Sequence, residues 1–153
     1  MRYHLLFTIA ILLFAACKKD KYTTAPQISY KSINPNAVFT NIPIQVMPVL
    51  TIEVTDAEGD LGLTGTDTAK IFIKNLITGN IDSSLRLPDL SAAAGKNFKA
   101  NVEITLDTQI LLEGTTRPSP KTDTLFYEVY IKDFAKNKSN VIITTDPVFL
   151  IFP

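Results

Sequence analysis

The fold of this chain is decided by one alternating stretch, Leu50-Thr51-Ile52-Glu53-Val54-Thr55. Its apolar residues stand at every second position, and side chains two residues apart along a strand point to the same face. In a helix, these apolar positions would be scattered around the circumference. The stretch therefore predicts a half-buried β-strand with one face against a core and the other toward solvent.

The same period of two recurs along the chain and predicts an all-β fold. Residues 28–33 alternate before the turn-forming Asn34-Pro35-Asn36, and residues 98–106 and 125–131 alternate in the same way. The remaining strands are expected over residues 69–77, 81–87, 141–145 and 148–152, with a hairpin turn at 78–80. We expect an antiparallel sandwich of about seven strands with one helical turn within residues 88–97 and no long helix.

Cys17 is the only cysteine, and it directly follows the apolar run Leu5–Ala16, which ends in two alanines. The run is too short for a bilayer core of about 30 Å, which needs about 20 helical residues, and Lys18-Lys19-Asp20-Lys21 stops it. An ordinary cleaved secretion signal is the alternative. The segment resembles a bacterial lipoprotein signal peptide, and the resemblance implies cleavage before Cys17 and acylation, palmitate included, at this residue.

This resemblance sets the expected organisation of the chain. Residues 1–16 form the signal peptide, and residues 17–26 form the lipidated cysteine and a flexible tether. Residues 27–153 form the β-sandwich domain. One acyl chain gives only marginal membrane binding, so a stable anchor needs more than one.

The amino-acid composition argues against several classes of function. Cleavage removes His4, the only histidine, and leaves the mature chain with one cationic residue fewer than its 15 acidic ones. Nucleic acid requires a concentrated positive face, and none stands out in the sequence, so no nucleic-acid partner is expected. Activated nucleophiles and zinc sites depend mostly on histidine or cysteine. We therefore expect no enzyme.

The C-terminal third resembles an immunoglobulin-like domain. Residues 123–129 look like the start of the sixth strand, where a tyrosine turns its hydroxyl back onto the preceding corner. Tyr127 fits this fold-defining role, and an ordinary core aromatic is the alternative. Val129 stands where antibody-type domains carry a disulfide cysteine. Together with Cys17 and residues 56–62, the chain resembles small immunoglobulin-like lipoproteins of Bacteroidota, which implies an envelope location and a sandwich but no activity.

One loop has the composition of a calcium site. Asp56, Glu58 and Asp60 stand at alternate positions around glycines, and Asp67 follows at the spacing of the last ligand of an EF-hand loop. The match is partial, because strands flank the loop in place of helices. In the alternative interpretation, Asp56 and Asp60 cap turns and the glycines supply positive φ. Calcium is the one cofactor that the sequence suggests.

Binding is the expected class of function, with the ligand-binding residues unknown. The first hypothesis is a protein-interaction or structural module that is lipid-anchored in the outer membrane. The alternatives are a carbohydrate-binding module that uses the outward Phe72 and Tyr130, and a peptidase inhibitor that uses the loop Glu113–Pro120, which is otherwise an ordinary connection. The expected partners are the membrane and an unknown protein or glycan. Lys18 follows the cysteine and Asp20 alone interrupts the lysines, which favours the periplasmic side.

Overall fold

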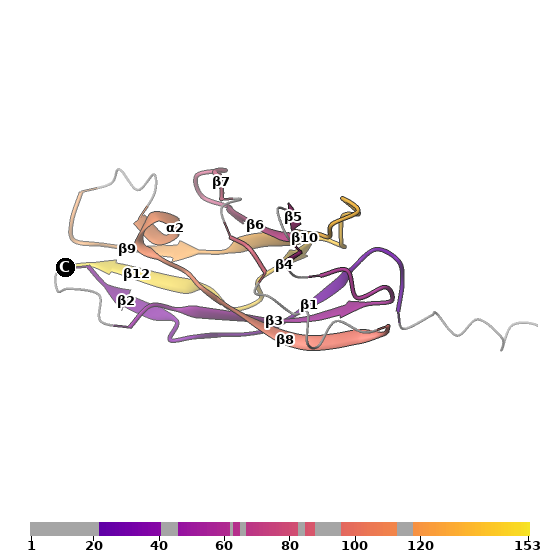
Figure 1. The fold of residues 1–153 in the computed structure, drawn as a ribbon. Coiled ribbons are helices and arrows are strands. Elements are labelled where there is room, and N and C mark those ends of the chain that lie inside the picture. The colour runs from indigo at the N-terminus through magenta and orange to yellow at the C-terminus, as the bar shows by residue number, and fades with distance from the viewer. Residues whose placement is uncertain are drawn as a thin grey trace, which may run out of the picture.

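The computed structural model describes residues 22–40, 46–61, 63–64, 67–82, 85–87, 96–112 and 118–153, and of residues 63–64, 67–68, 109 and 112 only the backbone. The strands in this part of the chain form an all-β sandwich, as the sequence predicts (Figure 1). The expected signal peptide, Cys17 and most of the segment 88–97 lie outside the described residues.

The first sheet contains the stretch that decides the fold. It has the order β1-β3-β8 and is antiparallel throughout, with β1 at Gln27–Asn34, β3 at Val49–Asp56 and β8 at Phe98–Thr105. In the central strand β3, Leu50, Ile52 and Val54 are completely buried. The intervening residues are half-buried, so the predicted two-faced strand is confirmed.

The second sheet lies opposite the first (Figure 1). It has the order β11-β10-β6-β7, with β11 at Ile142–Ile143, β10 at Tyr127–Lys132, β6 at Lys70–Asn75 and β7 at Ile81–Asp82. All of its pairings are antiparallel. The predicted hairpin turn between β6 and β7 is present, and Gly79 adopts a φ of 77° there, which a glycine tolerates without strain.

A third, smaller sheet extends the sandwich toward the C-terminus. It pairs β2 (Ala37–Phe39) parallel to β12 (Val148–Phe152), and β12 antiparallel to β9 (Lys121–Leu125). Strands β9 and β10 are separated by Phe126 alone, so one continuous segment serves two sheets. A short hairpin of β4 (Leu63–Thr64) and β5 (Asp67–Thr68) stands apart from these sheets.

A five-residue helix, α2 (Thr108–Leu112), follows β8 and was not predicted. Asp107 caps it, because its Oδ1 accepts a hydrogen bond of 3.1 Å from the backbone N–H of Ile110. The helix buries Ile110 and Leu111 in the core. None of the helices in the described ranges is long and apolar enough to cross a membrane.

The core joins the two facing sheets through one cluster of buried side chains. Tyr127, Val129 and Ile131 of β10 belong to the same cluster as the apolar face of β3 and are completely buried. Val129 thus packs as an apolar residue within this core. Burial also raises the pKa of the Tyr127 hydroxyl far above its usual range. Within the described part of the chain, this hydroxyl has no hydrogen-bond partner, so the corner role of Tyr127 stays a prediction.

The Tyr127→Phe variant tests that role. A buried hydroxyl without a partner destabilises a fold, so we expect the free energy of unfolding to stay the same or rise by up to about 1 kcal/mol. Urea unfolding measures it. Tyr130→Phe, at a half-exposed position of the same strand, is the control and should change little. A loss of about 1 kcal/mol in Tyr127→Phe would instead show that the hydroxyl makes the corner hydrogen bond.

Candidate functional site

The loop after β3 is organised by Asp56, which is completely buried. Its Oδ2 accepts hydrogen bonds from the backbone N–H groups of Gly59, at 2.6 Å, and Asp60, at 3.2 Å. Gly59 has a φ of 70°, in the left-handed region that glycine adopts readily. Asp56 and Gly59 therefore fill the turn-forming roles that the sequence offers as the alternative to calcium.

The structure adds a carboxylate that the sequence analysis did not place at this loop. Asp133, directly after β10, is completely buried, and both of its oxygens accept hydrogen bonds from Asn137, at 2.7 and 2.9 Å. The backbone N–H of Phe134 donates to the carbonyl oxygen of Asp60 at 3.4 Å. The loop after β3 and the turn after β10 are thus in contact at one end of the sandwich.

Burial governs the electrostatics of this end. Burial, with a smaller contribution from the neighbouring charge of Asp60, raises the pKa of Asp56 to about 6 against the opposing hydrogen bond from Gly59. The pKa of Asp60 is raised as well, first by burial and then by the charge of Asp133. The folded chain therefore favours a proton on Asp56 and on Asp60.

The predicted calcium ligands are only partly brought together. Glu58 is exposed, and the side chain of Asp67 lies outside the described residues. Oδ1 of Asp56 and Oδ1 of Asp60 are buried without a hydrogen-bond partner in the described part. Across the same residues, no group of three or more His, Cys, Asp or Glu side chains is arranged to hold a metal ion. Calcium binding at this loop stays a prediction.

The raised pKa of Asp56 predicts how stability depends on pH. Because the folded state binds the proton more tightly than the unfolded state, the stabilisation is complete below about pH 4 and is lost as the pH rises through about 6. We expect the free energy of unfolding to fall by up to about 3 kcal/mol between about pH 4 and pH 8. Urea unfolding across this range measures the fall.

Asp56→Asn should flatten this dependence, because an amide oxygen still accepts the backbone hydrogen bonds and carries no titrating proton. Glu103→Gln, at an exposed position of β8, is the matched control and should leave the slope unchanged. Stability that rises over this pH range would contradict the prediction.

A second candidate site lies on the outward face of β6 and β10. The rings of Phe72 and Tyr130, which are paired across the two strands, stack with their centroids 4.6 Å apart and an angle of 6° between their planes. The Nζ of Lys132 lies 5.4 Å from the centroid of Phe72, and the Nζ of Lys138 lies 4.0 Å from that of Tyr130. Each ring of the stack thus also has an ammonium group near it.

Beside these rings, four cationic residues form a line across the sheet. The pairing register sets Arg86 opposite Lys70, Lys70 opposite Lys132, and Lys132 opposite Lys138. We call these four residues the cation row. Neighbouring strands lie about 4.8 Å apart, so successive members stand close together. Lys70 and Lys132 also line a surface hollow of about 250 Å³ with Phe72, Asp133 and Lys136.

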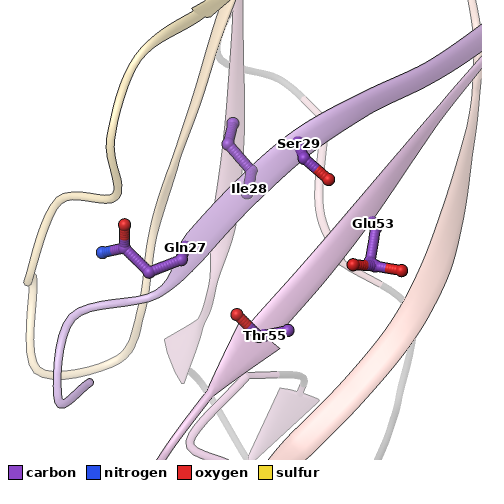
Figure 2. A pocket seen from close by; sticks show the side chains of 5 residues that line it. All are labelled: Gln27, Ile28, Ser29, Glu53 and Thr55. Carbon is purple, nitrogen blue, oxygen red and sulfur yellow. The ribbon is translucent and has the colours of Figure 1, made fainter. Parts of the chain in front are cut away.

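A second hollow lies on the opposite sheet and is not lined by lysines. Its lining residues are Gln27, Ile28, Ser29, Glu53 and Thr55 (Figure 2). Its one ionisable side chain, Glu53, is held by the Nζ of Lys99 at 2.9 Å and of Lys31 at 3.0 Å. Hydrogen bonds from these two lysines lower the pKa of Glu53. Glu53 on this face is therefore already paired with two lysines.

The sequence predicted the outward positions of Phe72 and Tyr130 but missed the cation row. Its members come from three separate segments, and only the strand pairing aligns them. Cys17 and most of the loop Glu113–Pro120 lie outside the described residues, so their predicted roles are unchanged. Comparison with protein families, with curated proteins and with solved structures found no match to this chain.

Proposed function

We propose that this protein is a lipid-anchored envelope lipoprotein with an immunoglobulin-like domain that acts as a non-catalytic protein-interaction or structural module. The anchor is Cys17, acylated after removal of residues 1–16. In this proposal, the protein is attached to the outer membrane and its domain lies on the periplasmic side. The observation that carries the domain part of this proposal is the strand order of the two facing sheets.

That order supports the immunoglobulin-like assignment. Taken in chain order, β1 and β2 correspond to strand A, β3 to B, β6 to C, β8 to E, β9 with β10 to F, and β11 with β12 to G. The two sheets then have the orders A-B-E and G-F-C, with β7 beside C as in variable-type domains. Strand D has no counterpart among the residues that the structure describes.

The use of the buried acidic groups supports a non-catalytic role. Asp56 holds a loop through backbone N–H groups, and Asp133 holds the turn after β10 through Asn137. On the sheet faces, Glu53 is paired with two lysines. These carboxylates act in the architecture of the domain, and sandwich domains offer loops and sheet faces to partners without any catalytic group.

Metabolic labelling tests the anchor. In a host that processes lipoproteins, the full chain should incorporate labelled palmitate and sediment with the outer membrane. Cys17→Ser should lose the label, because a hydroxyl does not replace the thiol in this modification. Lys18→Ser, at the next residue, is the matched control and should keep it. A label retained in Cys17→Ser, or an unlabelled wild type, would refute the lipoprotein assignment.

Protease treatment of intact cells tests the side of the membrane. We expect the domain to be protected until the outer membrane is opened, since the residues after Cys17 are mostly lysines. Cleavage of the domain on intact cells would place it on the surface instead and would leave the anchor itself unaffected.

A further inference from the structure

We propose that the outward face of β6 and β10 docks on an anionic lipid headgroup surface, with the cation row as the main contact. This inference deepens the proposed function, because it rests on a lipid-anchored chain and adds a second membrane contact to the anchor. The domain would then lie with its β11-β10-β6-β7 sheet toward the headgroups and its opposite sheet toward the surrounding compartment.

The outward face of β6 and β10 carries more cationic than acidic residues. The strand register places Lys74 and Glu128 on this face as well, opposite one another, so Glu128 is the acidic counterpart of that one lysine. The cation row has no acidic residue within it. The full sequence is balanced, with 15 cationic and 15 acidic residues, and the described ion pairs of Lys31 and Lys99 are on the other sheet. Among the residues that the structure describes, positive charge is thus concentrated on the outward face of β6 and β10.

The cation row sets like charges opposite one another on neighbouring strands. Like charges placed directly opposite one another across two strands destabilise a sheet. Here Lys70 faces both Arg86 and Lys132, and Lys132 also faces Lys138. The fold therefore places these cationic residues opposite one another although like charges repel. A surface of phosphate-bearing headgroups would relieve that repulsion.

The start of β1, where the tether meets the domain, contacts the segment that follows the cation row. At the start of β1, the N–H of Ile28 donates to Oδ1 of Asn140 at 2.7 Å, and Nδ2 of Asn140 donates to the carbonyl oxygen of Ile28 at 2.9 Å. Asn140 comes two residues after Lys138 of the cation row. The described chain enters the domain at the same end as the turn after β10, on the right in Figure 1. The anchor would thus hold this end close to the membrane.

The reach of the tether is compatible with this contact. Residues 18–26 span at most about 30 Å when extended, which lets the domain turn one face to the membrane without leaving it. Exposed apolar residues flank the charged face, since Ile81 stands opposite Lys74 and Ile143 opposite Glu128. Basic residues with neighbouring apolar side chains are the combination that binds an anionic interface.

Vesicle flotation tests the proposal with the mature chain from residue 17 carrying Cys17→Ser, so that no acyl chain contributes. Every buried core residue of the described part lies between Ile28 and Leu150, within this chain. We expect it to bind vesicles of phosphatidylcholine and phosphatidylglycerol at about three to one, and to leave pure phosphatidylcholine vesicles unbound. Raising the salt concentration to about 0.5 M should release it.

Two double variants with the same charge change locate the contact. Lys70→Gln with Lys132→Gln should weaken binding to the anionic vesicles by roughly 25-fold, about fivefold for each lysine. Lys31→Gln with Lys99→Gln, on the opposite sheet, is the matched control and should weaken it less than threefold. Melting temperature is the second measurement: the first variant should melt close to the wild type, because the relief of a like-charge pair offsets the loss of the contact between Lys132 and the Phe72 ring.

Each remaining outcome overturns the inference. Equal losses in both double variants would show a general charge effect and no specific face. Equal binding to neutral and anionic vesicles, or none to either, would show that headgroup charge has no part in it. Binding of a soluble polyuronate or of single-stranded DNA at the same lysines, with vesicles unbound, would assign the face to another polyanion. Labelling at Cys17 is independent of all these results, so the proposed function can survive their failure.

Discussion

The buried apolar face of β3 is the constraint on which the rest of this structure depends. Its three apolar side chains lie in the core while β1 and β8 pair with it on either side. A slip of one residue would turn Glu53 into the core, and an unpaired buried carboxylate is strongly unfavourable. On the outer face, Lys31 and Lys99 hold Glu53 from the two neighbouring strands. The same register is therefore favoured from both sides of the sheet.

Polar contacts connect the end of β3 to the neighbouring loops. Asp56 satisfies two backbone N–H groups, Asp60 and Phe134 link the loop after β3 to the turn after β10, and Asn140 links that region to β1. Hydrogen bonds in such a buried network are strong, and unpaired groups within it are correspondingly unfavourable. The raised pKa values of Asp56 and Asp60 follow first from their burial at this end of the sandwich, which outweighs the backbone hydrogen bonds that lower them.

The two outer faces of the sandwich differ in how their charged residues are paired. On the β1-β3-β8 sheet, Lys31 and Lys99 share the carboxylate of Glu53. On the β6 and β10 face, lysines and one arginine stand opposite each other, beside a pair of stacked rings. The stack and the adjacent ammonium groups stabilise each other through cation–π contacts, which keeps the charges outward and in place.

The sequence by itself determined the all-β class, the positions of the main strands and the inward residues of β3 and β10, because a period of two needs no distant partner to be recognised. It also predicted that Asp56 and Gly59 could form a turn, since both roles are local. The tertiary structure alone decided that Asp133 joins the Asp56 loop and that Arg86, Lys70, Lys132 and Lys138 form a row. Asp56 and Asp133 are far apart in the chain, as are Lys70, Arg86 and Lys132. Only the pairing of strands, driven by burial of their apolar faces, brings these segments together. The short helix α2 also escaped prediction, because its five residues are too few to show a helical period and depend on the core for their stability.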